Sequence, residues 1–345
     1  MPLAASLFKK CYTKPKSVNS EVSLSMNSTP NSLEDVIRAA KRALVIGVGG
    51  GGDVVGALAT ARFLEFCGLN FLLGGLSWER SPIDPLPGPR ALTEVRDVRA
   101  LHPYVWAANR QSRTTTDVYF CESRMAAIQN KEVLLVDISG GVKGVVEGLE
   151  VAMKEFNADL LVGLDVGGDS LAQGNEPGLR SPLADSIMLA AYTELEKRGQ
   201  RTLWGVFGYG SDGELSVDEI ELALSKLAAA GGWLGAWSLT PKIAAELEEV
   251  IKTVPTEASA IPVESFHGGW GQRKIRSGQR GVKMTPLNAL TFFLATTTLY
   301  ETLSRPAQAV RASASLEEAN NALHSIGIKT ELDLERERYK ARNKF

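Results

Sequence analysis

The sequence predicts an α/β fold, a Rossmann-like three-layer sandwich with a central, mostly parallel sheet. The first observation is a repeated order of an apolar strand, a loop rich in glycine and carboxylates, and a helix, which is typical of βαβ units. The second is that an aspartate follows the strand each time, at Asp53, Asp137, Asp165 and Asp212. Because ligands of open parallel sheets bind beyond the carboxyl ends of the strands, we expect one active-site edge.

Each element follows from its local pattern. Apolar runs bounded by turn residues predict strands at residues 43–48, 70–73, 98–106, 118–120, 131–136, 160–164 and 202–207. Helical spacing and capping residues predict helices at residues 33–42, 54–67, 122–127, 142–155, 182–197, 217–230, 241–253, 287–303 and 316–327. Residues 76–90 form a long, proline-rich connection, and loops of that length are often functional.

Composition limits the classes of protein to consider. The 345 residues are 44% hydrophobic and 23% charged, which is typical of a globular protein. A net charge of −2 gives no electrostatic reason to expect nucleic acid as a partner, and no apolar run reaches the roughly 18 residues of a membrane span. Cys11, Cys67 and Cys121 lack metal-ligand or CxxC spacing, which predicts reduced thiols and a cytoplasmic location.

Three regions are expected along the chain. Residues 1–31 are predicted to be a disordered tail, or to include a mis-annotated start with Met26 as the actual first residue; a transit peptide is the alternative, but these residues lack arginine. Residues 32–330 are expected to form a single α/β domain, and residues 331–345 a charged, solvated end. Trp233 and Trp237 fit either a homo-oligomer interface or the core.

The densest concentration of candidate ligands follows the sixth expected strand, where Asp165, Asp169, Glu176 and Asp185 occur among glycines. Crowded carboxylates repel one another, so they need a cation, a donor-rich ligand or raised pKa values. Only three histidines are present, and oxygen ligands suit Mg²⁺ or Mn²⁺ better than zinc. We expect Asp165 and Asp169, joined by Asp53, to bind the metal, and Glu176 or Asp185 to act as a base. The alternative is a solvated acidic loop.

A glycine run follows the first expected strand: Gly49, Gly50, Gly51 and Gly52. Such a run can cradle a phosphate on the amides of a helix N-terminus. Its spacing also fits a dinucleotide-binding motif, but no acid closes the next strand, and the absence of Gly-Lys-Ser/Thr excludes a P-loop. Two interpretations stay open: a ligand-binding loop, or a tight turn in which Asp53 caps the helix.

Positive charge is expected to orient an anionic substrate, because arginine binds phosphate or carboxylate bidentately. The candidate substrate-binding residues are all arginines of expected loops: Arg80, Arg90, Arg273, Arg276 and Arg280. His267 is a candidate general acid or base. The alternatives are a solvated basic loop and a structural histidine.

Four groups of motifs lie between about residue 42 and about residue 306: VGGGGDVVG from Val48, WER from Trp78 with the DP and PGPR that follow it, DVGGD from Asp165, and SPLAD from Ser181. Together they resemble the "domain of unknown function 1152" family, which is found mainly in archaea. The resemblance implies a fold grouping and carries no activity. A looser similarity, glycines followed by an acid at a strand end, is shared with metal-dependent phosphatases of the "domain of unknown function 89" type and with D-glutamate cyclase-like proteins.

These observations predict a divalent-metal-dependent enzyme that acts on a small phosphorylated or carboxylated metabolite, such as a phosphohydrolase. The metal would polarise the substrate or activate water. The alternative is a nucleotide-binding sensor or regulatory protein without catalysis, which would use the glycine run. A scaffold with purely structural loops is the third possibility.

Overall fold

The computed structural model of the protein describes residues 32–81, 83–254 and 256–343. Contacts group Asn31–Phe345 into one compact unit. The expectations for residues 1–31 lie outside the described residues.

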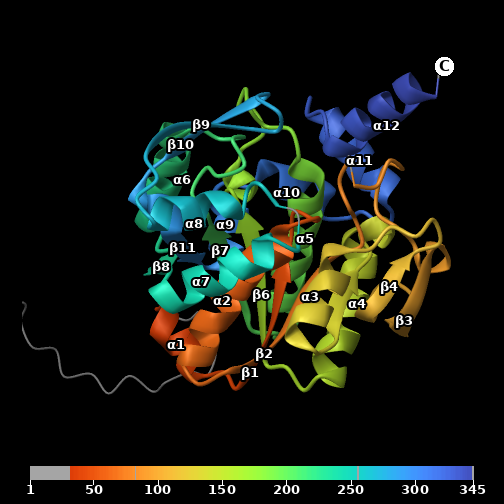
Figure 1. Ribbon diagram of the computed structural model, residues 1–345, viewed down its shortest axis with the longest axis horizontal. Coiled ribbons are helices and arrows are strands. Elements are labelled where there is room, and N and C mark those ends of the chain that lie inside the picture. The colour runs from red at the N-terminus through yellow and green to blue at the C-terminus, as the bar shows by residue number, and fades with distance from the viewer. Residues whose placement is uncertain (1–31, 82, 255, 344–345) are drawn as a thin grey trace, which may run out of the picture. The chain divides into compact units, whose positions relative to one another are not determined.

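Within the described ranges, nine strands form one sheet in the order β3-β4-β5-β2-β1-β6-β7-β11-β8 (Figure 1). The strands are β1 (Arg42–Gly47), β2 (Asn70–Leu76), β3 (Val95–His102), β4 (Val105–Thr114), β5 (Val133–Val136), β6 (Leu160–Val166), β7 (Thr202–Phe207), β8 (Trp233–Ser238) and β11 (Leu290–Leu294). Neighbours from β5 through β7 pair in parallel, whereas the outer strands pair antiparallel.

Helices cover both faces of the sheet, which confirms the predicted α/β sandwich with a mostly parallel centre (Figure 1). One face packs against α4 (Gly141–Glu155), α5 (Pro182–Lys197), α6 (Val217–Ala229), α9 (Thr296–Thr302), α10 (Arg305–Val310) and α11 (Leu316–Ser325). The other packs against α1 (Leu33–Arg38), α2 (Asp53–Phe66), α3 (Cys121–Gln129), α7 (Pro241–Ile251) and α8 (Ala260–Phe266). In the described part of the chain, no helix combines the length and apolarity needed to cross a bilayer.

The strand order places a topological switch point at the centre of the sheet. From β1 the chain continues to β2 on one side, and it later returns to β6 on the other side of β1. Every residue of β6 is buried, as expected for a strand covered on both faces. In open parallel sheets, ligands bind at the edge formed by the carboxyl ends of the strands around such a point. Asp53 and Asp165 lie at that edge.

Several elements differ from the sequence-based expectation. Residues 287–303, expected as one helix, contain β11 and α9, because a short apolar run does not distinguish a buried strand from a helix. The basic cluster forms a two-stranded antiparallel hairpin, β9 (Gly271–Ile275) and β10 (Arg280–Met284). Residues 118–120 contribute only an isolated bridge, and the expected strand at residues 98–106 spans the hairpin of β3 and β4.

The C-terminal end also differs. Residues 331–345 were expected to be solvated, but Glu331–Arg342 forms helix α12, and one side of its first turns is buried. Glu331, Leu332 and Glu335 are each less than 9% exposed. The expectation fails because charge density alone does not show which acids have buried partners. In Figure 1, α12 is the blue helix beside the C-terminus.

Candidate metal centre

Asp165 is held rigidly at the end of β6. Its Oδ1 accepts the N–H of Gly168 at 3.1 Å, and its Oδ2 accepts the N–H of Ser170 at 2.9 Å and the Ser170 hydroxyl. Gly167 and Gly168 have φ angles of 124° and 106°, a region that favours glycine, so the sequence allows this tight turn. The turn therefore fixes the Asp165 carboxylate at the carboxyl end of β6, next to β1.

Asp165, Asp169 and Asp185 form the first group of acids, with one oxygen from each lying within 4.8 Å of the others. Asp185 lies in the first turn of α5 and is 2% exposed. Neither of its carboxylate oxygens has a hydrogen-bond partner among the described residues. A buried acceptor without a donor costs roughly 1–3 kcal/mol, so this group needs a proton or a cation.

Asp169, Asp212 and Glu214 form the second group, again with oxygens within 4.8 Å of one another. Asp212 follows β7 and is 6% exposed, and neither of its carboxylate oxygens has a partner in the described part of the chain. Glu214, in contrast, accepts the N–H of Ser181 at 2.9 Å and a guanidinium hydrogen bond from Arg280 at 2.7 Å. Since Asp169 belongs to both groups, the five acids form one continuous cluster.

Burial raises the pKa values of the four aspartates of this cluster, Asp165, Asp169, Asp185 and Asp212. Burial, followed by the charges of Asp185 and Glu214, raises the pKa of Asp169 well above its usual range. Burial, followed by the nearby Asp165, also raises the pKa of Asp185, and it raises the pKa of Asp53 to about 7. At neutral pH these groups therefore compete for protons, and a bound divalent cation would relieve their repulsion.

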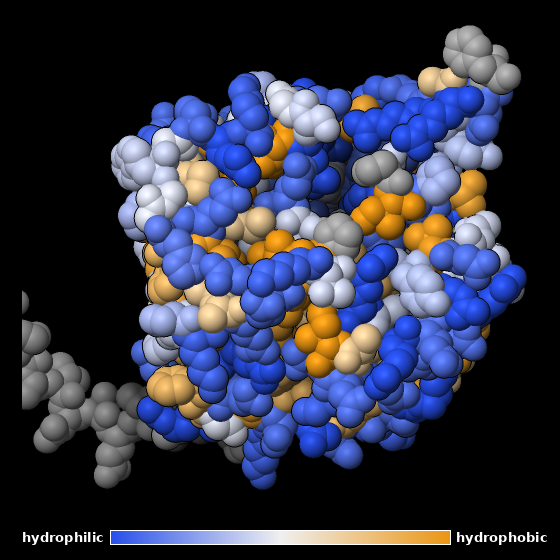
Figure 2. Space-filling view, in the orientation of Figure 1, coloured by the Kyte–Doolittle hydropathy of each residue, from blue (hydrophilic) through white to orange (hydrophobic). Residues whose placement is uncertain are grey.

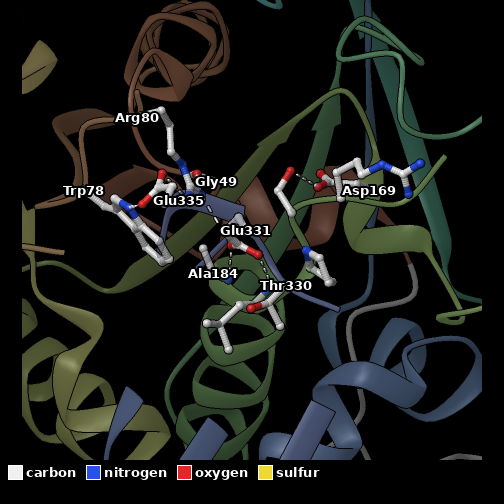
Figure 3. Close-up of polar contacts among 12 residues, drawn as sticks. Gly49, Trp78, Arg80, Asp169, Ala184, Thr330, Glu331 and Glu335 are labelled. Carbon is white, nitrogen blue, oxygen red and sulfur yellow. Dashed lines mark hydrogen bonds and ion pairs between the residues drawn. The ribbon is translucent and has the colours of Figure 1, made fainter. Parts of the chain in front are cut away.

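Arg80 provides positive charge beside the acids. Its guanidinium carbon lies 4.0 Å from the Trp78 ring centroid, and its Nη2 donates to the carbonyl of Gly49 at 2.5 Å (Figure 3). The same nitrogen lies 3.4 Å from Glu331, and Nη1 lies 3.8 Å from Glu335. Nη1 is buried and has no hydrogen-bond acceptor within the described residues. Glu331 and Glu335 thus offset the charge of Arg80, and Nη1 is the guanidinium nitrogen left without a hydrogen bond.

Helix α12 closes the cluster from the C-terminal part of the chain. The two oxygens of Glu331 accept the N–H groups of Leu183 and Ala184, each at 2.9 Å, in the first turn of α5 (Figure 3). Those amides have no partner within the helix, and the positive end of a helix dipole favours a carboxylate. Glu335 accepts the indole N–H of Trp78 at 2.9 Å. Glu331 and Glu335 therefore position the groups that surround Arg80. The sequence alone did not predict this role.

Two predicted catalytic residues lie outside the acid cluster. Glu176 accepts the N–H groups of three neighbouring loop residues at 2.8 to 3.0 Å, those of Gln173, Gly174 and Asn175. His267 is half-exposed at the end of α8, with its Nε2 2.9 Å from Glu248. Because local contacts account for both side chains, their placement does not support the predicted catalytic roles.

Arg90 also differs from its predicted role in substrate binding. It is 5% exposed, and its Nη2 donates to three carbonyls of its own loop, those of Leu86, Pro87 and Gly88. Its Nε lies 3.4 Å from Asp84. The guanidinium therefore ties the proline-rich connection together, which leaves it enclosed by protein groups.

The hairpin of β9 and β10 brings two of the predicted arginines to the site. Arg280 donates to Glu214 and, at 3.1 Å, to the carbonyl of Asp212. Arg276 lies in the turn between the strands, with its side chain 43% exposed and its Nε 3.9 Å from Glu257. Partial burial, followed by the positive charge of Arg280, lowers its pKa. Arg273 is 54% exposed and pairs with Glu264. Figure 2 shows a dark recess on this face between the hairpin and α12.

The glycine run is a packed turn. The N–H of Gly49 donates to the Asp53 carboxylate at 2.9 Å, and that of Gly51 donates to the Trp78 carbonyl at 3.0 Å. Gly50 has a φ of 81°, and a Cβ on Gly52 would lie 2.4 Å from the Cβ of Thr256. Asp53 thus closes this turn and lies outside both acid groups, although its charge interacts with Asp165.

Asp212 and Glu214 were not among the predicted site residues. The available signal was their position after a strand of a parallel sheet. The sequence favoured a turn instead, because Asp212 is followed by Gly213 and an Asp-Gly pair is a strong turn former.

A comparison with protein families identifies the group to which this chain is related. The family described as "Protein of unknown function (DUF1152)" matches residues 44–339. This range includes both acid groups, the arginine hairpin, Glu331 and Glu335. No curated protein and no solved structure matches the chain. Since the match covers most of the 345 residues, the chain belongs to the DUF1152 family.

Proposed function

We propose that this protein is a divalent-metal-dependent enzyme that acts on a small phosphorylated or carboxylated metabolite, with Mg²⁺ or Mn²⁺ as the metal. The observation that carries the proposal is the Asp185 carboxylate, which is buried, has no donor among the described residues and has an oxygen within 4.8 Å of Asp165 and Asp169 oxygens. Hard cations of this kind bind carboxylate oxygens, and buried carboxylates require compensation.

The three acids have distinct roles in this proposal. Asp165 is fixed by donors from its own turn, so it is the preorganised ligand. Asp185, without donors, is the ligand that gains most from a cation. Asp169 is oriented by a contact of 3.3 Å from the Ser181 hydroxyl. A metal held by these residues would polarise a substrate oxygen or lower the pKa of a bound water.

Asp53 is the candidate base. A general base works best when its pKa lies near the working pH, and the pKa of Asp53 is raised to about 7. The N–H of Gly49 donates to one of its carboxylate oxygens and orients it. In a phosphohydrolase, water would add across a phosphate ester to give an alcohol and inorganic phosphate, and Asp53 would accept a proton from that water.

Arginines next to the acids define the charge of the substrate. Nη1 of Arg80 has no hydrogen-bond acceptor among the described residues. After burial, the charges of Arg280 and Arg80 lower the pKa of Arg276, while Glu257, 3.9 Å from its Nε, acts in the opposite direction. Cations that repel one another in this way favour an anion between them, and arginine suits phosphate and carboxylate. A cation site and an anion site side by side are what a metal-bound anionic substrate requires.

The nucleotide-binding alternative has weaker support. Gly49 and Gly51 already use their N–H groups within the protein, which weakens the case for a phosphate cradle. The cytoplasmic location and the homo-oligomer remain predictions.

Thermal unfolding of the full chain with and without Mn²⁺ tests the proposal. A ligand that binds only the native state adds about 2.7 kcal/mol of stability at a hundredfold excess over its Kd. We expect Mn²⁺ to raise the midpoint of the wild type and to raise that of Asp185→Asn by much less. The matched control is Asp218→Asn, an exposed acid in the first turn of α6, which should keep the full shift. If Asp185→Asn also keeps it, the proposal is wrong. Release of phosphate from a panel of phosphate esters then tests the reaction.

A further inference from the structure

The second acid group also contains a buried carboxylate that the first metal position does not use. Asp212 is 6% exposed, and both of its carboxylate oxygens lack a hydrogen-bond partner in residues 32–81, 83–254 and 256–343. One of these oxygens lies within 4.8 Å of oxygens from Asp169 and Glu214. The first metal position, with Asp165, Asp169 and Asp185 as ligands, leaves this carboxylate unexplained.

The backbone is shaped to bring Asp212 to this point. A Cβ on Gly167 would lie 2.4 Å from the Asp212 Cγ, so the carboxylate fits directly against a glycine. The N–H of Gly210 donates to the Gly167 carbonyl at 2.7 Å, which ties the loop after β7 to the loop after β6. Asp212 is therefore directed into the cluster by packing and backbone contacts.

The net charge of the five acids also indicates whether the cluster suits one divalent cation or two. When ionised, the five acids of the two groups carry five negative charges, and Arg280 offsets one through its contact with Glu214. One divalent cation would leave two uncompensated negative charges in a buried site, whereas two cations would leave none. Uncompensated buried charge is strongly unfavourable, so the cluster is suited to two cations.

We propose that the cluster binds two divalent cations that share Asp169, the first also held by Asp165 and Asp185 and the second by Asp212 and Glu214. This inference rests on the proposed function and narrows it to phosphorylated substrates. Paired metals about 3.5–4 Å apart bind two oxygens of one phosphoryl group and stabilise its displacement. Arg280 then contacts Glu214 at the second metal, and Arg80 and Arg276 remain for the phosphate.

Manganese provides the test, because two Mn²⁺ ions bridged by a carboxylate couple magnetically. The full chain is stripped with chelator and titrated with Mn²⁺, and bound metal is counted while electron paramagnetic resonance is recorded. We expect two Mn²⁺ per chain with an exchange-coupled spectrum. Asp212→Asn should bind one, uncoupled, and the Asp218→Asn control should keep both. Inorganic phosphate should bind the two-metal wild type at least tenfold more tightly than it binds Asp212→Asn.

The outcomes separate this inference from the proposed function. A single Mn²⁺ that is lost in Asp185→Asn and kept in Asp212→Asn overturns the second position and retains the metal enzyme. Two ions without magnetic coupling contradict the shared Asp169 ligand. No bound Mn²⁺ overturns both proposals. The count and the spectrum of the wild type decide the matter even if a variant folds poorly.

Discussion

Arg80 and Glu331 meet 3.4 Å apart, although 251 residues separate them in the sequence. Arg80 follows β2, and Glu331 begins α12 with its carboxylate on the first amides of α5 (Figure 3). Because both side chains are largely buried, each depends on the other to compensate its charge. The pair therefore connects the stability of the C-terminal helix to the position of the proposed anion-binding arginine.

Replacing Glu331 with glutamine should destabilise the protein by about 3 kcal/mol, because removal of one partner leaves a buried charge uncompensated. Urea unfolding measures the change. The control is Glu337→Gln on the same helix, an exposed acid paired with Lys329, which should change stability by less than about 1 kcal/mol. Equal effects of the two variants would contradict the importance assigned to the pair.

Asp185→Asn should have opposite effects with and without metal. In chelator the variant should be more stable than the wild type by roughly 1–3 kcal/mol, because it removes the negative charge of a buried carboxylate that has no donor among the described residues. In Mn²⁺ the order should reverse, since the variant loses one ligand of the ion proposed at Asp165 and Asp169. Chemical unfolding in both buffers checks the crossover. A variant that is less stable in chelator would show that Asp185 has a favourable partner.

Stability without metal should fall as pH rises from about 4 to about 7. The folded-state pKa is raised from 3.8 to about 7 for Asp53 and to about 6 for Asp137, mainly by burial. The native state then binds more protons than the unfolded state in this window, so its stability is complete below the unfolded pKa and is lost as pH rises through the folded pKa. Unfolding free energies measured across this range test the slope, which Asp53→Asn should flatten. A slope unchanged in that variant would contradict the raised pKa of Asp53.

Arg276→Gln should weaken binding of inorganic phosphate to the metal-loaded protein by about tenfold, the equivalent of about 1.4 kcal/mol for one charged contact. The number of bound Mn²⁺ ions should not change, because Arg276 is not a ligand. Isothermal titration calorimetry measures both quantities. The exposed Arg273 of the same hairpin provides the control, and Arg273→Gln should bind phosphate like the wild type. Identical losses in the two variants would point to general electrostatic attraction.

Local patterns were sufficient for the central sheet. Strands such as β7, predicted at residues 202–207, are continuous apolar runs followed by glycine, and their burial on both faces makes them easy to recognise. The elements that local patterns did not predict correctly depend on pairing with residues that are distant in the sequence. β11 was predicted as part of a helix because its length and apolarity fit both structures, and only its pairing with β7 and β8 distinguishes them.

The same division applies to the site. Asp165, Asp169 and Asp185 share one loop and the helix that follows it, so sequence proximity pointed to them. Asp212 joins them only because β7 pairs with β6, and Glu331 only because α12 packs against the start of α5. Arg90 has the composition of a substrate-binding residue, yet its guanidinium is used by its own loop. Residue type alone did not distinguish site residues from structural ones, because the role of each side chain depends on the groups that it contacts in the folded protein.

The late position of α12 in the chain has a consequence for biosynthesis. Glu331 and Glu335, which compensate Arg80, are translated after every acid of the cluster. While the ribosome is still adding α12, the strands and acidic loops can pair, but the first amides of α5 and the Arg80 guanidinium still lack their carboxylates. Because chains begin to fold from the N-terminus during synthesis, this site can be completed only after α12 has been made.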